Sequence, residues 1–126
     1  MARRSLPALL SALAALSAVF AGVAAAAPSL PLLTVTPSSV HRGGHVQILG
    51  FAGSCPVGDT VTIMSRAFQS SHAFAGVPAV LTKVRRHDLF GTITRIRRGV
   101  HPGRYDVTAR CGGGNLGVAE HLVVRP

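Results

Sequence analysis

The chain beyond residue 31 consists of short runs in which apolar and polar side chains alternate. In the clearest run, Tyr105, Val107, Ala109 and Cys111 are separated by single polar or charged residues. A strict period of two is typical of a β-strand with one buried face. Turn residues interrupt these runs at intervals of roughly eight to twelve residues, and no segment combines a helical period with helix caps. The pattern therefore predicts an all-β domain.

Seven runs are predicted to be strands because each is short, rich in β-branched residues and bounded by Gly, Pro or Asp. They are residues 32–36, 45–51, 60–65, 79–84, 89–96, 104–111 and about 116–124. Residues 66–76 are the least regular, and they predict either a long loop or a weak edge strand. Seven or eight strands in this length favour an immunoglobulin-like, two-sheet antiparallel sandwich.

The first 26 residues have the order of a secretory signal peptide. Arg3 and Arg4 precede a run, 6–26, that is apolar or small throughout and ends in alanines. We expect cleavage after Ala26. An uncleaved anchor is the alternative, because about 20 apolar residues can span a bilayer; the high alanine content and the lack of a following basic signal favour cleavage. The expected organisation is a signal peptide at 1–26, a short Pro-rich leader at 27–31 and one domain at 32–126.

Both cysteines, Cys55 and Cys111, lie in the predicted domain. Exported proteins meet oxidising conditions, in which an even number of cysteines suggests a disulfide, and two cysteines allow one intramolecular pairing. A loop of this length would stabilise the fold by about 4 kcal/mol. That contribution matters because a domain of about 100 residues is only marginally stable. Two unpaired buried thiols are the alternative.

Three stretches resemble the immunoglobulin-like domains of secreted actinobacterial proteins. They are residues 33–40 followed by Gly43-Gly44, residues 55–61, and residues 102–111, which reads Pro-Gly-Arg-Tyr-Asp-Val-Thr-Ala-Arg-Cys. The resemblance implies a two-sheet sandwich whose bridge ties the loop after the second strand to the end of the strand that finishes at Cys111. It also implies a binding, adhesion or spacer role without catalytic residues.

The sequence departs from that family at some positions. It has no Trp, Tyr105 precedes Cys111 by six residues rather than two, and His87-Asp88 stands where members often have Asp-Gly. A weaker resemblance, carried by Thr34-Val-Thr-Pro-Ser-Ser39, is to the neocarzinostatin-type apoproteins. These have two disulfides, whereas only one is possible here. That resemblance implies a small-molecule carrier, in which Phe68 and Phe74 would line the cleft.

Positive charge is the strongest compositional feature. Thirteen Lys and Arg face four Asp and Glu, and without Arg3 and Arg4 the excess is still about +7. Such a field attracts anionic polymers. We expect the partner of an exported protein to be an anionic cell-wall polymer or a surface protein. The candidate binding residues form one concentration of arginines: Arg85, Arg86, Arg95, Arg97, Arg98 and Arg104.

Hairpin geometry predicts that the Arg85-Arg86 turn lies at one end of the sandwich and the Arg97-Arg98 turn at the other. A nucleic-acid-binding sheet would interleave exposed aromatic rings with this charge. The nearby rings, Phe90 and Tyr105, have inward-facing positions. Nucleic acid is therefore not an expected partner.

No pattern of catalytic or metal-binding residues emerges. The carboxylates Asp59, Asp88, Asp106 and Glu120 show no spacing that would converge them, and no Gly-x-Ser-x-Gly motif is present. The six histidines contain no His-x-His pair, and the cysteines no Cys-x-x-Cys pair. We expect a monomeric secreted or surface-associated binding or spacer module, with no enzymatic activity, metal or cofactor and no membrane contact after cleavage. The alternative is the small-molecule carrier.

Overall fold

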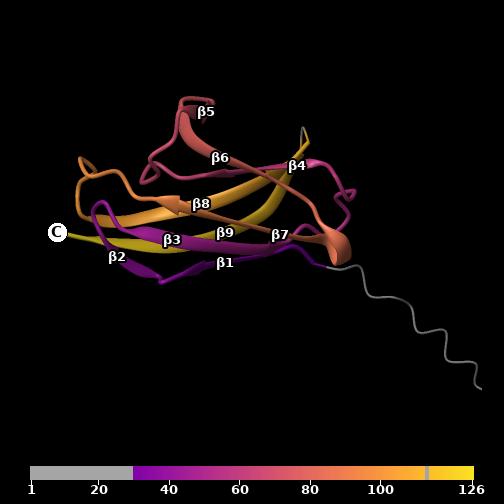
Figure 1. Cartoon of the computed structure of the whole chain (residues 1–126), viewed down its shortest axis with the longest axis horizontal. Helices are drawn as coiled ribbons and strands as arrows, with labels where there is room; N and C mark the ends of the chain where they lie inside the picture. The colour runs from indigo at the N-terminus through magenta and orange to yellow at the C-terminus, as the bar shows by residue number, and fades with distance from the viewer. Residues whose placement is uncertain (1–29, 113) are drawn as a thin grey trace, which may run out of the picture.

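The computed structural model describes residues 30–112 and 114–126, which form two β-sheets packed face to face (Figure 1). The described strands are β1 Leu32–Thr36, β2 Ser39–His41, β3 His45–Phe51, β4 Thr60–Met64, β5 His72–Phe74, β6 Val77–Lys83, β7 Leu89–Arg95, β8 Gly103–Cys111 and β9 Gly114–Arg125. A single 3₁₀ turn, Arg86–Asp88, precedes β7. The predicted signal peptide and most of the leader lie outside the described residues.

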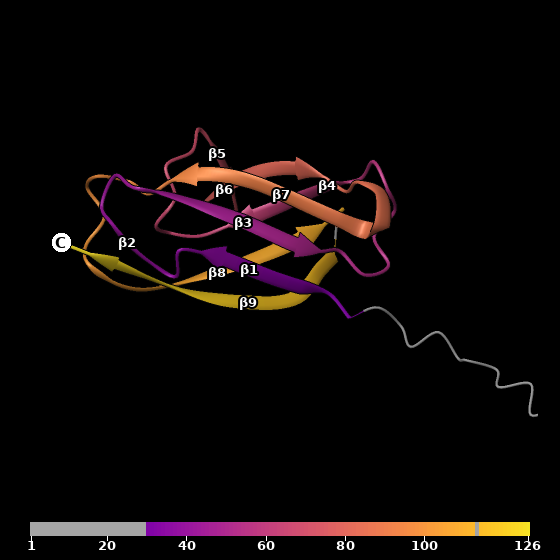
Figure 2. The ribbon, with the colours of Figure 1, turned by 60° about the horizontal axis from the view of Figure 1, so that its bottom comes forward.

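One sheet has three strands in the order β1-β3-β7, and the other has six in the order β2-β9-β8-β4-β6-β5. Every neighbouring pair is antiparallel except β2 and β9, which run parallel. Figure 2 looks onto β1, β3 and β7, which lie side by side, and the strands of both sheets run along the length of the molecule. The predicted all-β, immunoglobulin-like sandwich is confirmed.

The core lies between the two sheets and is built by the alternation that the sequence shows. Val46 and Ile48 of β3, in one sheet, and Val61 and Ile63 of β4, in the other, belong to the same buried cluster, and each of these four side chains is at most 1% exposed. The residues between them on both strands are exposed or half-buried. Burying an aliphatic side chain of this size contributes about 1.5–3 kcal/mol, so these rows supply most of the driving force for folding.

The sequence pattern did not predict the two short strands β2 and β5 unambiguously. After β1, the chain crosses to the other sheet, and β2 pairs with the end of β9. Only Val40 of β2 is buried, so the segment is too short to show a period. The irregular stretch 66–76 contains β5, a three-residue edge strand with all side chains exposed. The edge-strand alternative is therefore correct for its central part.

The predicted disulfide is also confirmed. Cys55 in the β3–β4 connection is bonded to Cys111 at the end of β8, with a Cα–Cα distance of 6.2 Å. That distance lies within the usual range for disulfides. The bond links positions 56 residues apart and closes one end of the sandwich. None of the described residues belongs to a helix that is long and apolar enough to cross a membrane.

The first prediction concerns this bond. Replacing both cysteines, as Cys55→Ser with Cys111→Ser, should lower the free energy of unfolding by about 2–5 kcal/mol, because the unfolded chain regains the entropy of a long loop. Urea unfolding followed by circular dichroism measures the loss. Reductant should shift the midpoint of the wild-type protein toward that of the variant and leave the variant itself unchanged. An unfolding midpoint equal to that of oxidised wild type would contradict the prediction.

The second prediction concerns a close approach between two strands of the three-stranded sheet. A Cβ atom at Gly50 would lie 2.0 Å from the Phe90 ring, which is itself only 2% exposed. The change Gly50→Ala should therefore destabilise the protein by about 1–3 kcal/mol through overpacking. The matched control is Gly99→Ala, where a Cβ meets nothing within 4 Å. Thermal unfolding should separate the two variants, and equal midpoints would refute the packing argument.

Candidate functional site

The antiparallel strands bring several connections to the same end of the sandwich, and backbone hydrogen bonds join them there. The Gly43 N–H donates to the carbonyl of Ile96 at 3.1 Å, and the Ile96 N–H donates to that of Gly44 at 2.8 Å. The Arg97 N–H donates to the carbonyl of Ala67 at 2.9 Å. These bonds join three connections, β2–β3, β4–β5 and β7–β8, into one continuous surface. The end of β9 belongs to the same surface, because the Arg42 N–H donates to the carbonyl of Arg125 at 3.2 Å.

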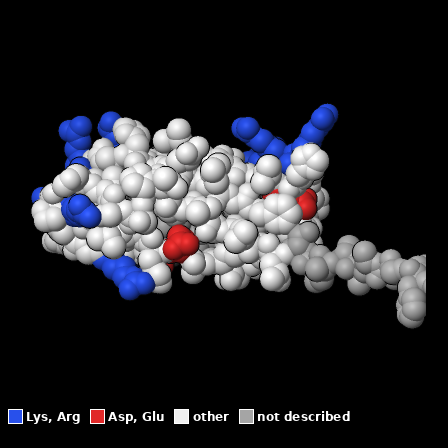
Figure 3. Space-filling view, turned by 90° about the horizontal axis from the view of Figure 1, so that it is seen from below, with Lys and Arg blue, Asp and Glu red and all other residues white. Residues whose placement is uncertain are grey.

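This surface, which we call the basic end, carries most of the cationic side chains. Apart from Arg3 and Arg4, the chain has eleven Lys and Arg residues, and seven of them lie here. They are Arg42, Arg66, Arg95, Arg97, Arg98, Arg104 and Arg125. In Figure 3 the Lys and Arg side chains of the visible face gather toward the two ends of the molecule and leave its middle bare.

Local contacts position part of this cluster. The Arg97 guanidinium donates from Nη2 to the carbonyl of Arg66 at 2.7 Å. The stem of Arg98 packs over Gly43, where a Cβ would come within 3.0 Å of its Cγ. Both arginines nevertheless remain exposed. Their guanidinium groups are therefore held at the surface. A guanidinium is planar and can make bidentate contacts with phosphate or carboxylate oxygens.

Two adjacent hollows indent the basic end, and both are lined by Arg66 and Tyr105. The first, of about 500 Å³, adds Arg97 and His101. The second, of about 400 Å³, adds Arg104 and Asp106 together with part of β4. The Tyr105 hydroxyl donates to the carbonyl of His101 at 2.5 Å, so the ring is held by the turn that leads into β8. Phosphate or carboxylate groups at this surface could contact several guanidinium groups.

The single carboxylate that lines these two hollows is already paired. Asp106 Oδ1 lies 2.9 Å from His121 Nδ1, and both side chains are more than half exposed. An exposed pair of this kind adds little to stability. The positive charge of the basic end therefore exceeds the local negative charge by a wide margin.

The six arginines predicted as binding residues divide between the two ends, as the hairpin geometry predicted. Arg95, Arg97, Arg98 and Arg104 belong to the basic end, whereas Arg85 and Arg86 lie at the turn before β7, at the opposite end. Sequence reasoning missed three members of the basic end, namely Arg42, Arg66 and Arg125. Each of them lies at or near a strand end: Arg42 follows β2, Arg66 lies just beyond β4, and Arg125 ends β9. The Arg42 N–H donates to the Arg125 carbonyl at 3.2 Å, beside the parallel pair of β2 and β9.

The cleft expected near Phe68 and Phe74 does not form between these rings. Phe68 is fully buried in the core. Phe74 is 42% exposed on β5, and the Arg110 guanidinium lies 4.8 Å from the centre of its ring. Such a cation–π contact stabilises the edge strand rather than opening a pocket.

The described residues contain one group with metal-ligand atoms close together, formed by Cys55, Asp59 and Cys111 within 4.8 Å of one another. The two sulfurs are joined in the disulfide, so they offer no thiolate to a metal. Four hollows on the described surface, two of them at the basic end, include one lined by Asp106 and one lined by Asp59. None of these four has the two facing carboxylates that glycoside hydrolysis requires.

The sequence matches no protein-family profile and no curated protein. Among solved structures, the chain is similar to part of the alkylpurine DNA glycosylase AlkC from Pseudomonas fluorescens bound to DNA with an abasic site analogue, with a TM-score of 0.51 and 17% identity over 78% of this chain. It is also similar to part of the β-glucosidase EmGH1 from Erythrobacter marinus, with a TM-score of 0.47 and 13% identity over 77% of this chain. The chain spans 31% and 15% of these proteins. The first similarity shows a shared sandwich fold.

The third prediction concerns the tyrosine between the two hollows. Changing Tyr105→Phe removes the hydrogen bond to the His101 carbonyl and should cost about 0.5–1.5 kcal/mol. Because that bond holds the turn before β8, amide hydrogen exchange of His101 and Gly103 should accelerate while exchange in β3 stays unchanged. Uniform acceleration throughout the domain, or none at the turn, would contradict a local role for the hydroxyl.

Proposed function

We propose that this protein is a non-catalytic, exported binding or spacer module that attaches to an anionic polymer of the cell envelope through its basic end. The observation that carries the proposal is the convergence of seven arginines on one surface, whose two hollows are lined by one acidic side chain, that of Asp106. Repeated phosphate or carboxylate groups along a polymer would each meet a guanidinium. Binding of this kind needs no deep pocket and is governed by charge.

Export is part of the proposal, and two features support it. The sequence begins with Arg3 and Arg4 followed by the apolar run 6–26, which is the order of a signal peptide. The disulfide of the described domain is of the kind that persists in oxidising compartments. In an exported protein, the negative charges of the cell envelope would be the nearest partners of the basic end.

The geometry also favours a spacer role. The described chain enters the sandwich next to β1 at the end opposite to the basic end, as Figure 2 shows. The strands run along the molecule between these two ends. Residue 30 and the basic end therefore lie at opposite ends of the sandwich.

The fourth prediction tests the basic end with polyphosphate as the probe. The variant Arg66→Gln/Arg97→Gln/Arg104→Gln should bind more weakly than wild type. The slope of log affinity against log salt should decrease by about 0.7 for each lost phosphate contact, if polyphosphate behaves as single-stranded nucleic acids do. Isothermal titration at several salt concentrations measures both quantities. Circular dichroism melting checks that the variant is folded.

The matched control removes the same charge from the other end, as Lys83→Gln/Arg85→Gln/Arg86→Gln. This control should keep most of the affinity and the salt slope. Equal losses in the two triple variants would show that net charge, rather than the basic end, governs binding, and would overturn the proposal. Pull-down of the folded variants on purified cell walls then relates the result to the envelope.

A further inference from the structure

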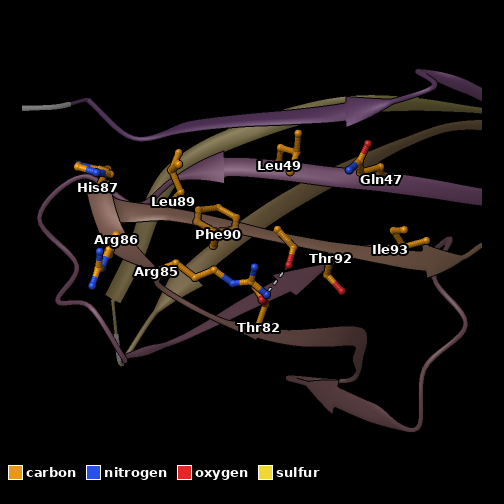
Figure 4. A pocket seen from close by; sticks show the side chains of 11 residues that line it. Gln47, Leu49, Thr82, Arg85, Arg86, His87, Leu89, Phe90, Thr92 and Ile93 are labelled. Atoms are coloured by element: carbon orange, nitrogen blue, oxygen red, sulfur yellow. Dashed lines mark hydrogen bonds between the residues drawn. The ribbon is translucent and has the colours of Figure 1, made fainter.

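A second surface, remote from the basic end, combines an apolar floor with a cationic rim. It is an open groove of about 1000 Å³ that runs beside β7 on the side of β6 (Figure 4). We call it the β7 groove. Its side chains come from β3, β6, β7 and the turn before β7: Gln47, Leu49, Thr82, Arg85, Arg86, His87, Leu89, Phe90, Thr92 and Ile93.

The floor is formed by apolar side chains on the outer face of the three-stranded sheet. Leu49, Leu89 and Ile93 are 50%, 51% and 67% exposed. Leu49 pairs with Gly91, and a Cβ at Gly91 would come within 2.8 Å of the Leu49 Cδ2 atom. Leu49 therefore lies over the glycine and joins the other two side chains into a continuous patch. Single exposed leucines are ordinary, but a patch within a groove marks a binding surface.

The rim of the groove is cationic. Arg85 and Arg86 lie at its mouth, and Figure 4 shows the Arg85 side chain pointing back along the groove toward Thr82. No carboxylate lines the groove. The nearest acidic residue along the chain, Asp88, is half-buried. The backbone carbonyl of Asp88 accepts a hydrogen bond at 2.8 Å from the N–H of Ala52, the residue that follows β3.

The turn that presents these arginines has an unfavourable backbone. His87 and Asp88 have φ angles of 61° and 60°, in the left-handed region that normally favours glycine. Each such residue costs on the order of 1 kcal/mol. The turn thus keeps side chains, including Arg86 and His87, at the mouth of the groove at the expense of backbone strain. Strain of this kind tends to occur at binding sites.

We propose that the β7 groove binds a single-chain anionic amphiphile, that is, an alkyl chain ending in a carboxylate or phosphate group. The chain would lie on Leu49, Leu89 and Ile93, and the head group would meet Arg85 and Arg86. From Leu89 to Ile93 the floor extends about 14 Å at ~3.4 Å per residue. Contact of the chain with this patch replaces water on both apolar surfaces, and the head group neutralises the rim.

An added peptide strand fits the groove less well, because the free edge of β7 is interrupted. The Thr82 hydroxyl donates to the Gly91 carbonyl at 2.9 Å. The Arg85 N–H donates to the carbonyl of Leu89, and the Gln69 N–H to that of Arg95. Three of the outward carbonyls of β7 are therefore already satisfied, which leaves too short an edge for strand addition. A neutral or cationic ligand would leave the guanidinium groups without a counter-charge.

The test uses dodecyl phosphate and dodecanoate below their micelle concentrations, titrated into the full oxidised protein and followed by calorimetry. Dodecyltrimethylammonium has the same chain with opposite charge and should bind at least tenfold more weakly. Shortening the anionic chain by two carbons should weaken binding by up to roughly 16-fold, since each buried CH₂ is worth about fourfold. Equal binding of the cationic chain, or no dependence on chain length, would overturn the proposal.

Variants assign the site. The change Arg85→Gln/Arg86→Gln should weaken the anionic amphiphiles about tenfold and abolish the preference over the cationic one. Leu49→Ser/Ile93→Ser should weaken every amphiphile tested, and since both side chains are exposed, melting should confirm an intact fold. The matched control Arg97→Gln/Arg98→Gln removes the same charge from the basic end and should change little.

Loss of amphiphile binding in the Arg97→Gln/Arg98→Gln control instead would overturn the proposal. Binding only to anionic phospholipid vesicles, and not to the free amphiphile, would also overturn it, because it would indicate a bilayer surface. The inference is independent of the proposed function: polyphosphate binding depends on the basic end, and amphiphile binding on the β7 groove. Either can fail without the other.

Discussion

Contact between the inner faces of the two sheets is the constraint on which the rest of this structure depends. The domain has no α-helix in its described part, so each sheet buries its apolar face only against the other. Rows such as Val46 and Ile48 against Val61 and Ile63 leave almost no polar group inside; Ser65 and Thr94 are the buried polar residues. The disulfide closes one end of this core and limits the entropy of the unfolded chain. Because alternate positions of each long strand are committed to packing, chemistry is left to the outer faces and the connections.

The basic end is built from side chains that lie outside the core. Phe68 and Ile96 of the connections pack in the core, but the arginines of the connections, such as Arg97 and Arg98, are exposed. Exposed positions tolerate a density of like charge that no interior position would accept. Gathering seven guanidinium groups on one surface costs repulsive energy, only partly screened by salt over about 8–10 Å. A bound polyanion would relieve that repulsion, and it would stabilise the folded form by mass action because the unfolded chain does not keep the arginines together. The charge distribution thus links polymer binding to the stability of the domain.

The sequence was informative where a period of two is uninterrupted. The bounds of β1 and β3 agree with the prediction because Pro37 and the surrounding glycines punctuate a clear alternation. Short or irregular segments gave no such signal. β2 has one buried residue and depends on a parallel neighbour distant in the chain. Phe68 was expected in a cleft, but it lies in the core. Its direction could not be predicted, because an isolated ring in an irregular stretch shows no alternation. Four arginines of the basic end, which lie close together in the sequence, were among the predicted residues. Arg42, Arg66 and Arg125 were missed, because only the pairing of distant strands brings them to the cluster.

The two proposed surfaces respond to different physical variables, because the sandwich separates them. The basic end relies on long-range Coulomb attraction among exposed groups, which salt weakens steeply. The β7 groove relies on apolar contact with Leu49, Leu89 and Ile93, which salt does not weaken, supplemented by two arginines at one mouth. Arg85 and Arg86 are contiguous in sequence with the apolar floor of β7 and distant from the basic end, so they belong to the groove. Nine arginines of the described domain therefore fall into two sets, the one proposed to bind charge along a polymer and the one proposed to orient a ligand held mainly by its apolar part.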